Sequence, residues 1–331
     1  MKAIIPVAGI GTQLRPHTHT QPKPLIPVAG KPILGHIIDN LIEAGVRKQV
    51  FIVGYLKEKL RHYVESTYAG QIEMEFVVQE PRKGLAHALW TAREIIAQED
   101  EILVLLGDTI FGDDTQVVLA TEGSTLAVHR VDDPREFGIV LLDEEQYVAR
   151  LVEKPEIPTS NLALVGMYKI TEVGMLVDIL NGMMGEVLDE GKEFSLTEAL
   201  MQMIQRGVRF QSHQVKNWFD CGRKQSLLHT NRVLLGRISE EPEQRYHHSV
   251  IIPPVHIAEG CDIRHSIVGP YVAIGENAKI YNSIVKDSIL GSYSRLDSII
   301  LGGSVVGNDA SLRGRANNIN IGDNTEIDFT E

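Results

Sequence analysis

The C-terminal part of the chain carries an apolar side chain at every sixth position, and few folds accommodate that spacing. A period of six with intervening glycines is typical of a parallel β-helix, in which each flat side turns one aliphatic residue inward and three sides close a coil. An antiparallel sandwich is the alternative, but its strands would alternate at a period of two. We therefore predict a left-handed β-helix of four to five coils over residues 250–331. The series are Ile257 and Ile263; Val268, Ile274 and Ile280; Ile284, Leu290 and Leu296; Ile300, Val306 and Leu312; and Ile321 and Ile327.

The first half of the chain alternates short apolar runs with helical patterns. Strands are expected at 3–7, 49–54, 72–78 and 101–106, and helices at 32–44, 56–66 and 84–97. Alternation of this kind favours an α/β fold with a Rossmann-like, mostly parallel sheet that helices cover on both faces. Further helices are expected near 172–181 and 195–206, among less regular strands. The polar segment 239–249 is interpreted as a linker.

Composition narrows the class of protein. The 331 residues, 43% hydrophobic and 23% charged, are ordinary for a soluble protein with two domains. The net charge of −12 provides no basic field for nucleic acid or an anionic membrane. The two cysteines form no disulfide framework, and the sequence contains neither a signal-peptide pattern nor an apolar run of membrane length. We therefore expect a cytoplasmic protein.

The stretch "IPVAGIGTQLRPHT" at 5–18 runs from an apolar strand into a glycine-rich turn. Thr12 follows Gly11 where a Walker loop needs lysine, and Leu14 stands where a dinucleotide fingerprint needs a third glycine. Pro16 disfavours a helix, so the segment is expected to stay a loop. A glycine loop beyond the end of a parallel strand lets backbone N–H groups approach a phosphate closely, although a plain turn remains the alternative.

Five segments extend this pattern along the chain. They are "AGIGTQLRPHTHTQPKPLIPVAGKPIL" from residue 8, "VVQEPRKGLAHAL" at 77–89, "LLGDTIF" at 105–111, "LVEKP" at 151–155 and "NWFDCGR" at 217–223. In this order they resemble the sugar-1-phosphate nucleotidyltransferases, over residues 1 to about 235. The resemblance is strongest to the long-form glucose-1-phosphate thymidylyltransferases, and "IPVAG" also resembles bacterial glucose-1-phosphate uridylyltransferases.

The resemblance implies a nucleotidyltransferase catalytic domain at 1–238, the linker at 239–249 and a β-helix domain at 250–331. The implied reaction joins a sugar 1-phosphate, expected to be glucose 1-phosphate, to dTTP or UTP and releases pyrophosphate, with Mg²⁺ as cofactor. We expect a homo-oligomer that binds neither nucleic acid nor membrane. An acyltransferase activity of the β-helix is an alternative, but His256 and His265 are the only plausible bases noted there.

Two aspartates are expected to hold the metal. Asp108 and Asp220 each follow an apolar run and precede a turn, so two carboxylates from distant positions could share one Mg²⁺. Lys23 stands between two prolines, and the resemblance implies that it contacts the triphosphate. Asp113 and Asp114 are expected to be solvated loop residues.

The resemblance also implies how the two substrates are bound. Lys154 would hold the sugar phosphate and Glu153 would accept hydrogen bonds from sugar hydroxyls, the alternative being a surface ion pair of little energetic worth. Gly138 would let the backbone approach the sugar, and Val165 would line the same pocket. The Gln79 amide complements the N3–H and O4 edge of a pyrimidine. The expected nucleotide-binding residues are Ala8, Gly9, Gly11, Thr12, Gln79 and Gly84.

Gln13 departs from the family pattern. The family has arginine at this position, where it binds the triphosphate and stabilises the transition state, and glutamine carries no charge. Arg82 or Lys83 could supply the charge from the next loop, whereas Arg15 also occurs in members that keep the usual arginine. We therefore expect an active enzyme with Gln13 in its catalytic site, and a weakly active or regulatory sugar-nucleotide-binding homologue as the alternative.

Overall fold

The computed structural model describes residues 1–185, 193–237 and 246–314. The chain forms two compact units, Met1–Thr230 and Asn231–Glu331. Most of the predicted linker, and the repeat members Ile321 and Ile327, lie outside the described residues.

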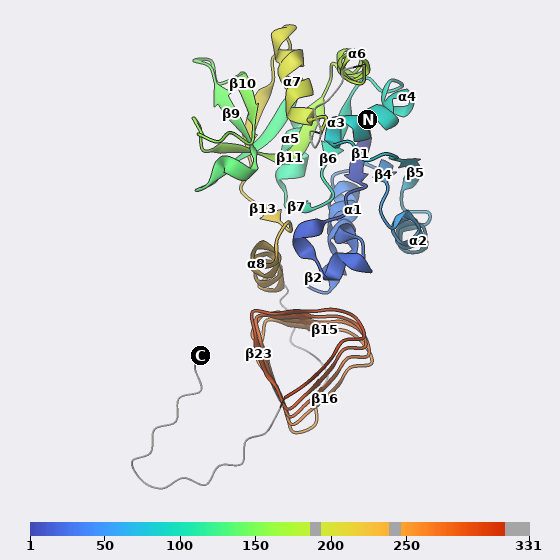
Figure 1. The fold of residues 1–331 in the computed structure, drawn as a ribbon, viewed down its shortest axis with the longest axis vertical. Helices are drawn as coiled ribbons and strands as arrows, with labels where there is room; N and C mark the ends of the chain where they lie inside the picture. The colour runs from blue at the N-terminus through green and yellow to red at the C-terminus, as the bar shows by residue number, and fades with distance from the viewer. Residues whose placement is uncertain (186–192, 238–245, 315–331) are drawn as a thin grey trace. The chain divides into compact units, whose positions relative to one another are not determined.

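A nine-stranded mixed sheet forms the centre of the first unit (Figure 1). Strands β6, β1, β4 and β5 run parallel to one another, and β11 pairs with β6 in the antiparallel direction. The predicted parallel sheet is thus confirmed for the first four strands, and the later strands extend it with mostly antiparallel pairs. The main path is β10 (Val148–Glu153), β9 (Gly138–Leu142), β11 (Leu162–Ile170), β6 (Ile102–Leu105), β1 (Lys2–Val7), β4 (Lys48–Val53) and β5 (Glu73–Val78), with β8 (Thr125–Arg130) pairing to β11 and to β12 (Gln211–Gln214).

Helices cover both faces of this sheet, as predicted. On one face the helices α3, α6 and α7 share a buried core with Ile4 and Val104. On the other face Phe51 stacks on Phe76 at 5.4 Å between ring centroids, and Arg61 of α2 lies 5.0 Å from the Phe76 ring centroid. None of the described helices combines the length and the apolar character needed to cross a membrane.

The helices begin and end close to the expected positions, except that the helix expected at 84–97 is divided at Ala92. They are α1 (Ile33–Glu43), α2 (Lys57–Tyr68), α3 (Leu85–Thr91), α4 (Arg93–Ile96), α5 (Asp114–Ala120), α6 (Val173–Met183), α7 (Leu196–Gln205) and α8 (Lys224–Leu235).

The second unit contains three parallel sheets that close into a triangular coil (Figure 1). Four strands stack on each side, so the described residues form four coils and the predicted left-handed β-helix is confirmed. One side contains β14 (Val250–Ile251), β17 (Ile267–Val268), β20 (Ile284–Lys286) and β23 (Ile300–Gly302). The next contains β15 (Val255–Ile257), β18 (Val272–Ile274), β21 (Ser288–Leu290) and β24 (Val305–Val306), and the third β16 (Asp262–Arg264), β19 (Lys279–Tyr281), β22 (Arg295–Asp297) and β25 (Ser311–Arg313).

The coils are shorter than three sides of six residues would require. Val250 pairs with Ile267 seventeen residues later, Ile267 with Ile284 after seventeen, and Ile284 with Ile300 after sixteen. A one-residue offset in a strand turns a side chain to the opposite face. The prediction that Ile284 and Ile300 face inward is therefore wrong, since they are 40% and 77% exposed while Val285 is fully buried.

These outward residues form a vertical stack on one side of the β-helix, which we call the aliphatic column: Val250, Ile267, Ile284 and Ile300. All four are exposed. On the β15 side, by contrast, the outward-facing Ile289 is buried. On the β16 side, outward residues include the exposed pair of Arg264 with Asp262. Among the described residues of this unit, the column contains most of the exposed large hydrophobic side chains; Ile252 and Tyr293 are the others.

We predict that Ile280→Ala lowers the free energy of unfolding of the β-helix by about 2–5 kcal/mol, because Ile280 is fully buried and its removal leaves a cavity. Ile284→Ala removes the same groups from the exposed column and should change stability by less than about 1 kcal/mol. The measurement is urea unfolding by circular dichroism. Both tryptophans, Trp90 and Trp218, lie in the first unit and report its transition separately by fluorescence. Equal losses in the two variants would contradict the register described above.

Candidate active site

The glycine-rich turn folds back on the lysine that follows it. Gly11 has φ +69°, a conformation that favours glycine, and a Cβ there would lie 2.8 Å from Cβ of Lys23. The Thr18 hydroxyl donates to the Gly11 carbonyl at 2.8 Å, which fixes the loop from the other end. The expected loop is confirmed, although it contains three short 3₁₀ turns at Thr12–Leu14, His17–His19 and Lys23–Leu25.

Lys23 contacts the first predicted metal ligand directly. Its Nζ donates to Oδ2 of Asp108 at 2.6 Å. Burial alone would raise the pKa of Asp108, but the ammonium of Lys23 outweighs burial and holds that pKa below its usual value. Burial alone would lower the pKa of Lys23, but the charges of Asp108 and Asp220 outweigh it and raise that pKa. The pair is therefore fully charged at neutral pH.

A two-stranded sheet brings the second aspartate to the first. Strand β13 (Trp218–Asp220) pairs antiparallel with β7 (Thr109–Phe111), and Asp220 lies opposite Thr109. The Cys221 N–H donates to the Asp108 carbonyl at 3.0 Å, so the two motifs are joined through their backbones. The Gly222 N–H donates to Oδ1 of Asp220 at 2.8 Å and orients that carboxylate.

One cavity of about 800 Å³ gathers most of the predicted residues. Its wall includes Gln13, Lys23, Asp108, Gly138, Glu153, Lys154, Val165 and Asp220. A smaller adjoining cavity of about 260 Å³ shares Lys23 and Asp108 with it and adds Gly9 and Gly11. Segments that are distant in the sequence, from the glycine loop to β13, therefore share one site.

Hydrogen bonds hold in place the part of this cavity that contains Glu153 and Lys154. The Thr197 hydroxyl at the start of α7 donates to Oε2 of Glu153 at 2.6 Å. A Cβ on Gly138 would lie 3.0 Å from the Thr197 hydroxyl and 3.2 Å from Oε2 of Glu153, so glycine leaves room there. The Lys154 N–H donates to the Phe137 carbonyl at 3.1 Å. Thr197 lay outside the sequence motifs, and only its place beside a helix N-terminus could have drawn attention to it.

Four of the predicted nucleotide-binding residues do not line either cavity: Ala8, Thr12, Gln79 and Gly84. Gln79 is buried, and its amide donates to the Gly84 carbonyl at 2.9 Å and contacts Nδ1 of His87 at 3.1 Å. Gly84 precedes α3, where a Cβ would lie 2.6 Å from the Phe194 carbonyl oxygen. In this structure Gln79 thus braces the turn at Gly84.

The cavity also contains a cation that the motifs did not single out. Arg223 follows Asp220 by three residues and lines the 800 Å³ cavity. Arg15, Arg82 and Lys83, which were considered beside Gln13, do not line it. Among the described residues, six carboxylates and three cations line this cavity. The carboxylates are Asp108, Asp133, Glu136, Glu153, Glu193 and Asp220, and the cations are Lys23, Lys154 and Arg223.

The expectation that Asp114 is solvated is wrong. Asp114 is only 6% exposed, and its carboxylate accepts the N–H groups of Lys216 at 3.1 Å and Asn217 at 2.9 Å. These residues directly precede β13, so Asp114 fixes the strand that carries Asp220. The adjacent Asp113 is exposed, as expected. The sequence could not separate the two aspartates, because their partners lie about a hundred residues away.

The chemistry of the two aspartates is compatible with a magnesium ion. Carboxylate oxygens are the protein ligands that Mg²⁺ prefers, and Mg²⁺ commonly takes one or two of them with phosphate oxygens and water. Within the described ranges no group of three or more His, Cys, Asp or Glu side chains is arranged to hold a metal. Asp108 and Asp220 are two carboxylates, fewer than such a group contains, and the Lys23 ammonium contacts one oxygen of Asp108 in this structure.

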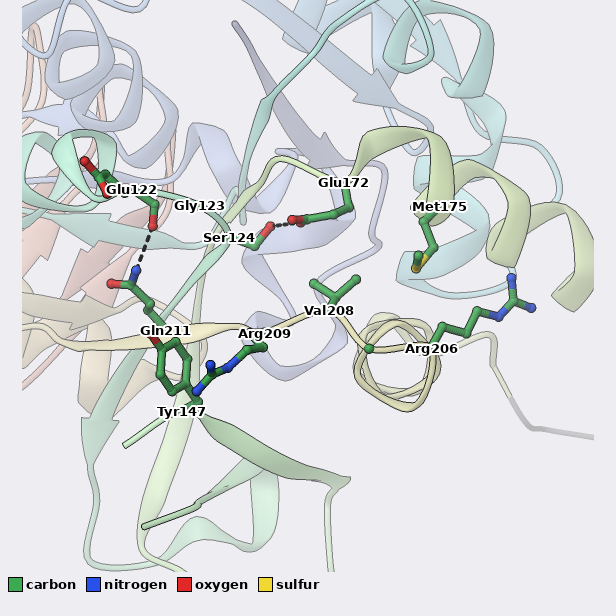
Figure 2. A pocket seen from close by; sticks show the side chains of 11 residues that line it. Glu122, Gly123, Ser124, Tyr147, Glu172, Met175, Arg206, Val208, Arg209 and Gln211 are labelled. Carbon is green, nitrogen blue, oxygen red and sulfur yellow. Dashed lines mark hydrogen bonds between the residues drawn. The ribbon is translucent and has the colours of Figure 1, made fainter. Parts of the chain in front are cut away.

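A second cavity of about 440 Å³ lies elsewhere in the first unit (Figure 2). Figure 2 shows Gln211 reaching the carbonyl of Glu122, at 2.7 Å. The guanidinium of Arg209 lies 3.8 Å from the ring centroid of Tyr147. None of the predicted site residues lines this cavity.

Comparison with known families gives two matches. Residues 2–236 match the family model described as Nucleotidyl transferase, and residues 239–292 match the one described as GlmU-like, C-terminal hexapeptide. The first match covers more than half of the chain.

Individual relatives agree with these matches. The chain is 36% identical over 265 residues to the Bifunctional protein GlmU of Methanocaldococcus jannaschii, covering 78% of this chain and 61% of that protein. It is 31% identical over 225 residues to UTP–glucose-1-phosphate uridylyltransferase AglF of Haloferax volcanii, covering 66% and 89%. A solved UDP-glucose pyrophosphorylase complexed with UDP-glucose superposes with a TM-score of 0.62 at 25% identity, covering 72% and 99%. The chain thus spans about three fifths of the length of the GlmU relative.

We predict that Asp114→Ala lowers the free energy of unfolding of the first unit by about 1–3 kcal/mol, because the N–H groups of Lys216 and Asn217 lose a buried, charged acceptor. Asp113→Ala is the matched control and should change it by less than about 0.5 kcal/mol, since that side chain is exposed. Urea unfolding followed by tryptophan fluorescence measures both. Equal stability of the two variants would show that Asp114 does not hold this loop.

Proposed function

Because this chain belongs to the nucleotidyl transferase family, we propose that it joins a sugar 1-phosphate to a nucleoside triphosphate. An oxygen of the sugar phosphate attacks the α-phosphorus in line. A new P–O bond forms as the bond from that phosphorus to the β-phosphate oxygen breaks, and pyrophosphate leaves. No covalent intermediate on the protein is required, so catalysis consists of positioning and charge stabilisation.

One observation carries this proposal: a single cavity contains the Lys23–Asp108 pair, Asp220 and the Glu153–Lys154 pair. Lys23 remains protonated beside two carboxylates and is suited to face the triphosphate. Glu153, held by Thr197, is suited to accept hydrogen bonds from sugar hydroxyls. Lys154 is suited to the sugar phosphate.

The excess of carboxylates over cations supports a metal requirement. Two polyanionic substrates cannot approach each other in an acidic cavity unless further positive charge is present. Mg²⁺, held by Asp108 and Asp220, would neutralise charge on the phosphate oxygens when bound. The residues themselves bind and orient the substrates.

We propose glucose 1-phosphate as the sugar substrate and dTTP or UTP as the nucleotide. The resemblance to thymidylyltransferases and uridylyltransferases supports both nucleotides, and the relative AglF is a uridylyltransferase by name. Thymine and uracil differ by one methyl group, which in an apolar pocket discriminates by about 1–3 kcal/mol. A cytoplasmic location stays a prediction.

We also propose that the β-helix mediates homo-oligomer formation through the aliphatic column. Its four β-branched side chains repeat at the spacing of neighbouring strands, about 4.8 Å, and carry no charge. Such a column is complementary to an identical one, because equal spacing lets side chains of two copies interdigitate. Since four residues form a small interface, we expect association that depends on concentration.

The test of function is a grid of nucleoside triphosphates against sugar 1-phosphates with Mg²⁺, read by pyrophosphate release. We predict turnover with dTTP or UTP and glucose 1-phosphate, and loss of turnover in EDTA. Asp108→Asn and Asp220→Asn should each lower kcat about 100-fold or more, roughly 2.7 kcal/mol of barrier, with little change in side-chain volume.

The outcomes separate the enzyme from its alternative. Unchanged activity of both asparagine variants at limiting Mg²⁺ would place the metal elsewhere. If no pair of substrates reacts above background, the chain is a sugar-nucleotide-binding homologue, which Gln13 in place of arginine favours. Calorimetric binding of UDP-glucose or dTDP-glucose would then support that second function.

For assembly, we predict that the double variant Ile267→Lys/Ile284→Lys lowers the mass measured by light scattering to that of one chain, because four like charges would meet in a dimer. The matched control is Lys279→Glu/Arg295→Glu on the β16 side, which should leave the mass unchanged. A wild-type protein of one chain at every concentration would contradict the proposal, as would a double variant with unchanged mass.

A further inference from the structure

Arg223 is a cation of the active-site cavity to which no sequence motif assigned a role. It lines the same wall as Glu153, Lys154 and Asp220. Its side chain is 53% exposed, and Nη2 lies 3.1 Å from Oε2 of Glu136, which is 58% exposed. An exposed ion pair of this kind is weak and can exchange its partner.

The backbone places Arg223 and Lys154 beside the same short segment. Arg223 pairs with the side chain of Glu136, while the Lys154 N–H donates to the carbonyl of the next residue, Phe137, at 3.1 Å. Gly138, at the sugar end of the cavity, follows directly. The Arg223 side chain and the Lys154 backbone therefore both contact residues 136–137, and both residues line the cavity.

The charge of a sugar phosphate explains why a second cation is needed there. A phosphate monoester carries about 1.5–2 negative charges at neutral pH. Lys23 is committed to Asp108, which leaves Lys154 alone against the carboxylates of the sugar end. A guanidinium can bind two phosphate oxygens at once, which an ammonium cannot do in the same planar geometry.

We propose that Arg223 binds the phosphate group of the sugar 1-phosphate together with Lys154, releasing Glu136 as the substrate enters. This assignment rests on the function proposed above. We assign Arg223 to the sugar phosphate because its partner Glu136 lies two residues before Gly138, which is expected to lie against the sugar. The glycine loop, which is expected to face the triphosphate, lies in a different segment of the chain. Glu136 acts as a temporary partner of the guanidinium in the free protein.

Steady-state kinetics test the assignment. Arg223→Gln should raise KM for glucose 1-phosphate about 10- to 100-fold and leave KM for the nucleotide within about twofold, because a charge-assisted bidentate contact is lost. Arg223→Lys should recover part of the loss. Lys224→Gln is the matched control, since this neighbouring exposed lysine does not line the cavity. Glu136→Gln should lower that KM, because the guanidinium is then no longer held by a carboxylate in the free protein.

Three results would overturn the proposal. An unchanged KM for glucose 1-phosphate in Arg223→Gln would remove Arg223 from the site. A rise confined to KM for the nucleotide would assign it to the triphosphate. An equal rise in Glu136→Gln would show that the ion pair only supports the fold.

Calorimetry separates this proposal from the function on which it rests. Glucose 1-phosphate is titrated into wild type and Arg223→Gln with Mg²⁺ and a non-hydrolysable analogue of dTTP or UTP present. Weaker binding by the variant supports the assignment even if the wild type turns over no substrate pair, in which case only the enzymatic proposal fails. Equal binding by the two proteins overturns the assignment even in an active enzyme.

Discussion

The site depends on the side-by-side placement of β1 and β6 in a parallel sheet. Parallel neighbours end at the same edge, so the glycine loop after β1 and Asp108 after β6 meet there. The Lys23–Asp108 contact then joins residues 85 positions apart. The β7–β13 pair adds Asp220 to the same edge. Each carboxylate therefore takes its position from backbone pairing, which leaves little freedom to the distance between the two.

Short sequence patterns predicted the parts of the fold that depend on residues close together in the chain. These parts are the glycine turn, the four parallel strands and the period of the β-helix, which could be predicted because each produces a pattern among neighbouring residues. Ile284 was assigned to the wrong face because the coils take sixteen or seventeen residues, a number set by corner geometry and not by the hydrophobic period. The burial of Asp114 and the ion pair of Arg223 were missed for a different reason: their partners Lys216, Asn217 and Glu136 lie far from them in the sequence or in another motif, so no short pattern indicates these contacts.

The charge of the main cavity connects Gln13 with Arg223. The protein is acidic overall, and so is the described wall of its main cavity. Gln13 contributes no charge to that wall, whereas Arg223 contributes a cation beside Glu136. Because a charge acts most strongly where water is excluded, the position of each cation matters more than their number. Under the function proposed above, more of the fixed positive charge would lie with the sugar phosphate, and the triphosphate would depend more heavily on Lys23 and on Mg²⁺.

Close packing at the ends of β1 and β6 fixes the distance between the Lys23 ammonium and the Asp108 carboxylate. A Cβ on Gly107 would lie 2.3 Å from Cγ1 of Val7 and 3.0 Å from the Pro6 carbonyl oxygen, closer than real Cβ contacts. Any larger residue would have to push the end of β6 away from β1. Since Asp108 is the next residue, such a shift would act directly on the 2.6 Å contact with Lys23. Glycine at position 107 therefore maintains both the packing of β6 against β1 and the contact between Asp108 and Lys23.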